Sequence, residues 1–284
     1  MSEARLDAAY AQCDSELREH DRDRWLACLF APADKRRYLH AIYAFSFEIA
    51  RARDLVSEPR LGEIRLQWWR DVIAGEARGD VGGHPAALAL LDTMGRFSLP
   101  RPAFLALIDA RAFDLYNDPM PSLNDLEGYC GETSSALIRL ASLILGGNEE
   151  PGGADAAGHA GVAYALTGLL RALPWHAARG QAYLPADLLA RHGASPAELA
   201  AGRLTPGLAA AIADMRAIAR RHVVAALKSA PLMTESARPA LMPLGLVEPY
   251  LRLMERGGFD PFRDPVELPQ WRRQWALWRF ARRL

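Results

Sequence analysis

The chain has 284 residues, of which 50% are apolar and 24% are charged. This is the composition of a globular protein with a sizeable buried core, and it excludes wholesale disorder. The 34 basic and 34 acidic residues give a formal net charge of zero. No global field therefore attracts nucleic acid, and we expect no nucleic-acid partner.

The cysteines and the termini indicate where the protein works. Cys13, Cys28 and Cys130 are few and far apart, which argues against a disulfide framework or a zinc cluster and favours a reducing compartment. The first residues lack the apolar core of a secretory signal, and no run of 18 apolar residues would span a bilayer. We therefore expect a cytoplasmic protein that is soluble or peripheral to a membrane.

Helical spacing of apolar residues dominates the chain, and stretches with strand character are almost absent. The predicted helices, in chain order, span residues 38–56, 63–76, 102–115, 123–145, 156–170, 206–228, 239–256 and 268–284. Ser195 and Glu198 form a capping box at a helix start, and Ser122 begins a weaker version. Residues 146–153 are rich in glycine and read as a hinge-like loop, but helical character continues on both sides. The sequence thus predicts one all-α domain over residues 1–284.

Several blocks in the correct order resemble the squalene/phytoene synthase family. They are residues 29–32 with Arg36 and Arg37, residues 41–45, Asp114, Tyr129 with Cys130, and Arg171 followed by the Gly-Gln-Ala-Tyr-Leu-Pro stretch 180–185. The resemblance implies the isoprenoid synthase fold, a single multi-helix domain around a central cavity.

The chemistry of that family depends on carboxylates that this chain lacks. The resemblance implies two Asp-x-x-x-Asp pairs that hold Mg²⁺ against prenyl diphosphates, since Mg²⁺ prefers oxygen ligands. The first pair reads Ala50 and Asp54, and the second reads Ala172 and His176. We therefore expect no catalytic residue, no metal-ligand set and no cofactor, with Mg²⁺ needed only if the chain is an active enzyme.

A substitute for the first metal site is suggested by the residues that remain. Glu48, Arg51 and Asp54 are spaced i, i+3, i+6, so Arg51 would lie between two carboxylates along a helix as an ion-pair ladder. The alternative is that Arg51, Arg53 and Arg171 bind a diphosphate directly, because guanidinium groups bind phosphates well.

The resemblance also implies that eight residues of this chain line the apolar tunnel in which the family binds its prenyl substrates. Aromatic residues at helical spacing are equally typical of an ordinary core, so both interpretations stand. The candidate pocket residues are Tyr43, Phe47, Arg51, Asp54, Tyr129, Tyr164, Arg171 and Tyr183.

The C-terminal helix carries a second candidate surface. Trp271, Trp275 and Trp278 fall at i, i+4, i+7 on one face, and Arg272 and Arg279 add basic charge. Tryptophan favours the bilayer interface and arginine attracts anionic lipid headgroups. Three interpretations remain: the tryptophan face packs on the body of the protein, contacts a membrane surface, or fits a groove on a partner.

The run 47–58 and the run 62–70 resemble a subgroup of the family with eroded aspartate motifs. That subgroup includes the mitochondrial complex I assembly factor. The leading hypothesis is a non-catalytic, membrane-peripheral assembly factor, with complex I subunits as partners and a prenyl lipid or prenyl diphosphate as a candidate ligand. It would lie on the inner face of the plasma membrane, or on the matrix side if mitochondrial. The alternatives are an active squalene- or phytoene-synthase-type prenyltransferase and a prenyl-lipid carrier.

Overall fold

The computed structural model describes residues 3–78, 80–147 and 149–284, and they are mostly helical. The α-helices are α1 (Glu3–His20), α2 (Arg22–Cys28), α3 (Ala33–Ala50), α4 (Pro59–Ala74), α5 (Pro85–Arg96), α6 (Arg101–Arg111), α7 (Leu123–Cys130), α8 (Ala136–Gly146), α9 (Ala154–Arg171), α10 (Leu173–Ala178), α11 (Ala186–Arg191), α12 (Pro196–Ala200), α13 (Pro206–Ser229), α14 (Val247–Leu253) and α15 (Gln270–Ala281). Five short 3₁₀ segments are η1 (Arg51–Arg53), η2 (Val81–Gly83), η3 (Ala112–Leu115), η5 (Ala230–Leu232) and η6 (Arg238–Leu246), and η4 (Gly131–Ser135) is a π-helix. In these ranges the only β-pairing is an isolated bridge between Gly152 and Met233, so the all-α prediction is confirmed.

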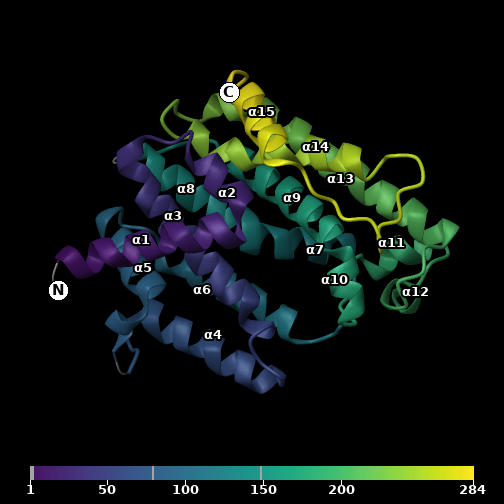
Figure 1. The fold of residues 1–284 in the computed structure, drawn as a ribbon, viewed down its shortest axis with the longest axis horizontal. Coiled ribbons are helices and arrows are strands. Elements are labelled where there is room, and N and C mark those ends of the chain that lie inside the picture. The colour runs from purple at the N-terminus through teal and green to yellow at the C-terminus, as the bar shows by residue number, and fades with distance from the viewer. Residues whose placement is uncertain (1–2, 79, 148) are drawn as a thin grey trace.

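The helices pack around α9, which runs through the middle of the molecule (Figure 1). It contacts α8, η4, α13, α14 and η6. The N-terminal helices α1, α3 and α5 pack on one another, and α3 joins them to α8. Helix α4, packed on α6, lies at the end of the molecule opposite α15 in Figure 1.

Most predicted helices are present, but several end or change their winding earlier than predicted. The range 38–56 contains α3, which stops at Ala50, and then the 3₁₀ turn η1. The range 123–145 is α7, η4 and α8 in succession, and 239–256 is mainly η6 followed by α14. The predicted loop 146–153 joins α8 to α9, and residue 148 lies outside the described part. Helices α1, α2, α5, α10 and α11 lie outside the ranges that spacing predicted, and α12 was indicated only by its capping box.

Side-chain caps explain several helix starts. The predicted box is confirmed: Ser195 Oγ accepts from the backbone N–H of Glu198 at 3.3 Å, and the Glu198 carboxylate accepts from the N–H of Ser195 at 2.9 Å. Ser122 caps α7 in the same way, with 3.2 Å between its Oγ and the N–H of Asp125. These bonds satisfy N–H groups that have no partner inside the helix.

The core runs through the whole bundle and includes all three cysteines. Phe45 lies at its centre, with its ring centroid 5.0 Å from that of Trp69 and 5.6 Å from that of Phe104. Burial raises the pKa of the Cys13 and Cys130 thiols to about 12, so both are protonated and unreactive at neutral pH. None of the described helices combines the length and the apolar character needed to cross a bilayer.

Candidate functional site

The first eroded motif lies where α3 ends, and its only buried carboxylate is Glu48. This side chain is 3% exposed and accepts a hydrogen bond from Arg51, and the Arg65 guanidinium lies 3.7 Å away. The Arg51 guanidinium also lies over the Phe47 ring, 4.9 Å from its centroid. Burial lowers the pKa of the adjacent His84 below its ordinary value, although the Glu48 carboxylate acts to raise it. The His84 imidazole is therefore neutral. Arg51 and Arg65 thus balance the Glu48 charge.

The predicted ladder is wrong in its second half, because Arg51 does not bridge to Asp54. Helix α3 ends at Ala50, and the tighter winding of η1 turns Asp54 away from the line of Glu48 and Arg51. Asp54 is instead ion-paired with Arg179, which follows α10 and lies 4.0 Å from the centroid of the Trp175 ring. This pair joins the segment of the first motif to the segment of the second.

The second eroded motif presents an alanine and a buried histidine. Ala172 separates α9 from α10, and His176 lies in α10 with its ring centroid 4.5 Å from that of Tyr183. Burial lowers the pKa of His176 to about 4, against the opposing field of Asp114. Its Nδ1 is buried without a hydrogen-bond partner in the described structure. His176 is therefore a neutral imidazole packed against an aromatic ring.

These residues do not fit a magnesium cluster. Mg²⁺ needs several oxygen ligands in octahedral geometry, and a single imidazole suits softer metals. Of the four motif positions only Asp54 keeps a carboxylate, and Arg179 binds it. Among residues 3–78, 80–147 and 149–284, no group of three or more His, Cys, Asp or Glu side chains is arranged to hold a metal ion.

A polar cluster around Asp114 occupies the space beside His176. The Asp114 carboxylate accepts from Tyr129 at 2.8 Å, from Tyr183 at 2.6 Å and from Arg111 at 2.9 Å. The Gln181 amide donates to the Asp114 carbonyl at 2.9 Å. Burial raises the pKa of both tyrosines, and the Asp114 charge raises it further, so both phenols stay protonated as donors. We call these five residues the Asp114 cluster: they share hydrogen bonds and the charges of Asp114 and Arg111, while Arg111 Nε is buried without a partner in the described structure.

Tyr43 and Tyr164 flank an arginine that the sequence did not single out. The Arg24 guanidinium lies 5.2 Å from the centroid of each ring, which is a cation–π arrangement on both sides. Asp21 accepts from Arg24 Nη1 at 3.0 Å and from its backbone N–H at 3.1 Å, so it also caps α2. The two candidate tyrosines are therefore used in holding α2 against α3 and α9.

Arg171 belongs to another cluster, centred on a buried aspartate of α2. Asp23 is 6% exposed and lies 2.9 Å from Arg171 Nη1 and 3.3 Å from Arg273 Nε. The Tyr250 hydroxyl donates to the same carboxylate at 2.8 Å, and the Arg171 guanidinium lies 3.6 Å from the Tyr250 ring centroid. We call these four residues the Asp23 cluster. It joins α2, α9, α14 and α15.

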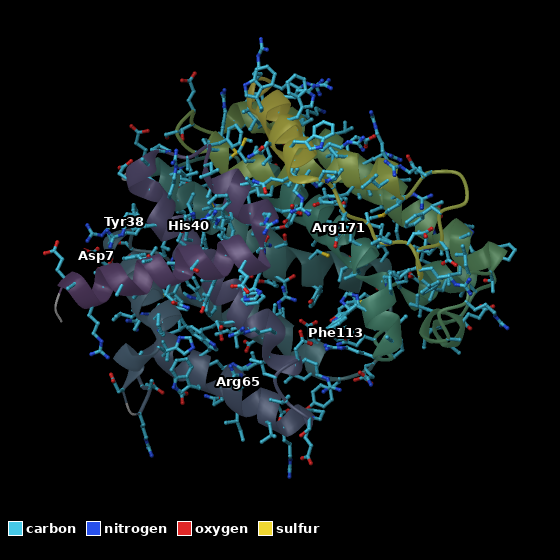
Figure 2. The ribbon with its side chains drawn as sticks, viewed as in Figure 1. Asp7, Tyr38, His40, Arg65, Phe113 and Arg171 are labelled. Atoms are coloured by element: carbon cyan, nitrogen blue, oxygen red, sulfur yellow. The ribbon has the colours of Figure 1, made fainter. Side chains whose placement is uncertain are left out.

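The eight candidate pocket residues thus lie in several groups. The structure brings together Tyr129 with Tyr183, Tyr43 with Tyr164, and Phe47 with Arg51, whereas Asp54 and Arg171 each meet partners the sequence did not identify. Figure 2 shows the separation: Phe113, which packs against Tyr183 of the Asp114 cluster, lies well below Arg171. The residues that sequence reasoning missed are Asp23, Arg24, Arg111, Arg179 and Tyr250.

The C-terminal helix shows which of its faces packs on the body. Leu277 is fully buried and Phe280 is nearly so, and both face η6. Trp271, Trp275 and Trp278 are 63%, 55% and 44% exposed. The interpretation in which the tryptophan face packs on the body is therefore wrong, because Leu277 and Phe280 provide the packing face instead.

The fold defines the class: an all-helical protein with the architecture of the isoprenoid synthases. The family model described as squalene/phytoene synthase matches residues 17–279, and the chain belongs to that family. A solved structure of a dehydrosqualene synthase in complex with a ligand superposes with a TM-score of 0.80 at 20% identity, over 96% of this chain and 95% of that one.

Two named relatives have different functions. The NADH dehydrogenase (ubiquinone) complex I, assembly factor 6 of Rattus norvegicus is 30% identical over 91% of this chain and 78% of its own length. The presqualene diphosphate synthase of Rhodopseudomonas palustris is 32% identical over 86% of this chain and 87% of its own length. Identity alone therefore does not choose between assembly and catalysis.

Proposed function

We propose that the chain is a non-catalytic member of the squalene/phytoene synthase family that acts in the assembly of respiratory complex I at a membrane surface. The observation that carries the proposal is the ion pair between Asp54 and Arg179. It lies between the segments that the family resemblance assigns to Mg²⁺ binding. A guanidinium group there supplies a fixed positive charge where a metal cluster would supply an exchangeable one.

The surrounding residues support the same conclusion. Arg51 and Arg65 are paired with Glu48, and Arg171 is paired with Asp23, so each of these three arginines already has a buried carboxylate partner. Removing an arginine from a buried partner to bind a ligand costs several kcal/mol. A neutral prenyl lipid would not incur this cost, so it is the candidate ligand in the proposal in preference to a prenyl diphosphate. The similarity to complex I assembly factor 6 supplies the biological role in the proposal.

The first prediction is that the folded protein releases no diphosphate from farnesyl or geranylgeranyl diphosphate in a Mg²⁺-dependent manner. The reason is that Asp54 is the one carboxylate left at the four motif positions. Diphosphate and lipid products would be measured with Mg²⁺ and with chelator, and circular dichroism would establish that the protein is folded. The presqualene diphosphate synthase of R. palustris serves as the positive control. Steady metal-dependent release by this chain would end the non-catalytic proposal.

An active head-to-head prenyltransferase is the second candidate, and the 32% identity to presqualene diphosphate synthase favours it. In that case Asp54 would have to leave Arg179 to reach a metal. Replacing Asp54 with asparagine would then abolish turnover, whereas under the leading proposal there is no turnover to lose.

The second prediction concerns complex I. Loss of this protein from its native cells is expected to remove most of the NADH:ubiquinone oxidoreductase activity of their membranes, because unassembled subunits are inactive. A copy carrying Asp54→Asn is expected to restore that activity as well as the wild type does. The exposed pair with Arg179 contributes only about 0 to 1 kcal/mol to stability, so the variant stays folded. Unchanged complex I activity after loss of the protein would contradict the assembly role. If only the wild-type copy restored activity, the carboxylate would have a chemical task.

A further inference from the structure

The orientation of α15 is set by its inner face. Phe280 packs so closely on η6 that a Cβ on Gly245 would approach its Cβ to 2.7 Å, so this contact requires glycine. Arg273 adds an ion pair to the buried Asp23 at 3.3 Å. The outer face of α15 is thus held toward solvent, at the edge of the molecule in Figure 1.

That outer face carries three tryptophans, of which two form a stacked pair. The rings of Trp275 and Trp278 lie 5.0 Å apart with an interplanar angle of 24°, and Trp271 precedes them by one turn. Exposed aromatic surface of this size is rare on a soluble protein unless it binds something. Indole rings are favoured where an apolar phase meets water, because one edge is apolar and the N–H needs a polar partner.

The charge on the same helix has one sign. Residues 270–284 contain arginines and no acidic residue. Arg273 is bound to Asp23, whereas Arg272, Arg279, Arg282 and Arg283 are exposed. This surface is therefore complementary to an anionic partner although the whole chain has a net charge of zero.

A groove of about 530 Å³ lies beside this face, between α15 and the helices α13 and α14. Its apolar lining includes Leu227, Leu244 and Leu253, and its rim includes Arg256, Arg272 and Arg283. One acid lines it, Glu248, and this carboxylate accepts from Arg220 at 2.9 Å and from Arg252 at 2.8 Å. Although burial opposes the shift, these two arginines lower the pKa of Glu248, so it remains paired rather than repelling an anion.

We propose that the outer face of α15 and this groove form a docking site for an anionic phospholipid bilayer, with one acyl chain in the groove. The tryptophans lie in the headgroup region, the arginines bind lipid phosphates, and the leucines line the path of the chain. Apolar area continuous with a basic rim is the pattern of an interfacial helix. The site rests on the membrane-surface part of the proposed function and names the surface that would make the contact, whereas it does not depend on whether the interior is catalytic.

A bilayer fits these observations better than an acidic helix of a partner protein. A partner helix in the groove would cover Trp271 and Trp275, which line it, but it would leave Trp278 exposed, because Trp278 lies outside the groove. A planar interface covers both surfaces at once. Helix α15 therefore lies in the membrane surface with its inner face still packed on η6.

The test is flotation of the full chain with vesicles of phosphatidylcholine alone and of phosphatidylcholine with phosphatidylglycerol. We expect binding to the anionic vesicles only. The double variant Arg272→Gln, Arg279→Gln is expected to lower the partition coefficient about 30-fold, because each arginine near an anionic surface contributes a factor of about five. The triple variant Trp271→Ala, Trp275→Ala, Trp278→Ala is expected to lower it more than about tenfold.

Matched controls lie on other faces of the molecule. Arg60→Gln with Arg203→Gln removes the same charge from exposed sites, and Trp175→Ala removes an exposed tryptophan outside α15. Both are expected to leave vesicle binding unchanged. Wild-type protein that ignores anionic vesicles, or α15 variants that bind like the wild type, would overturn the proposal. In the first case an acidic protein partner becomes the occupant to seek.

A second pair of variants tests whether an acyl chain occupies the groove. Leu227 lines the groove and is 38% exposed, so Leu227→Glu places a charge in the groove without burying it in the core. Leu61→Glu is the control, since Leu61 is 46% exposed on α4, at the opposite end of the molecule. We expect only Leu227→Glu to weaken binding to anionic vesicles. Equal binding by the two variants would remove the groove from the site.

Discussion

Replacing Asp23 with asparagine is expected to lower the free energy of unfolding by about 3 kcal/mol. The substitution keeps the size of the side chain and an acceptor for the Tyr250 hydroxyl, but it removes the charge that Arg171 and Arg273 share. Arg273 is 14% exposed and Arg171 is 27% exposed, so water replaces the lost partner only in part. An uncompensated buried charge costs more than the ion pair contributed.

Urea unfolding of Asp23→Asn beside Asp7→Asn would measure this effect. Asp7 pairs with Arg37 at 2.7 Å, but its side chain is 59% exposed, so its loss should cost no more than about 1 kcal/mol. Equal stability of the two variants would mean that the Asp23 cluster contributes no more than a surface ion pair. Because Arg273 is on α15, the Asp23 variant should also loosen the C-terminal helix and make it more sensitive to protease.

The helices were predictable because their signals are local. Apolar residues three and four positions apart mark one helical face, and caps such as Ser195 with Glu198 mark a start. The places where winding changes were not predictable. In η6 the apolar spacing continues, but Pro243 lies inside the segment and lacks the N–H that an α-helix would use there. Helix α1 was missed because its apolar residues are few, and its stability comes from packing on α3 and α5.

The sequence predicted one local contact of the candidate site but not the distant ones. The spacing of Glu48 and Arg51 correctly predicted their ion pair. No local pattern identifies Arg179 as the partner of Asp54, 125 residues away, or Asp23 as the partner of Arg171, 148 residues away. Charged residues can pair with any opposite charge that the fold brings near, so the pairing follows from the tertiary structure.

Replacing Gly161 with alanine is expected to destabilise the protein by about 3 kcal/mol, although alanine is the better helix former. Gly161 lies in α9 against the π-helix η4, and a Cβ there would overlap the backbone of Ser135. The adjacent hydrogen bond from Ser135 Oγ to the Gly158 carbonyl, at 2.6 Å, holds the two segments together. Overpacking against a flexible side chain costs about 1 to 3 kcal/mol, and backbone atoms can yield only if a whole helix moves.

The matched control is Gly158→Ala, one turn earlier in the same helix. A Cβ on Gly158 would meet no atom within 4 Å, so this variant should gain up to about 1 kcal/mol from helix propensity. Thermal or urea unfolding of both variants separates the cost of the Cβ clash with Ser135 from the gain in helix propensity. Gly161→Ala as stable as the wild type would mean that η4 moves away from α9 at little cost. Because η4 directly follows α7, a movement of η4 that relieves the clash would shift Tyr129 relative to Asp114, and disruption of this buried hydrogen bond would add to the expected loss of stability.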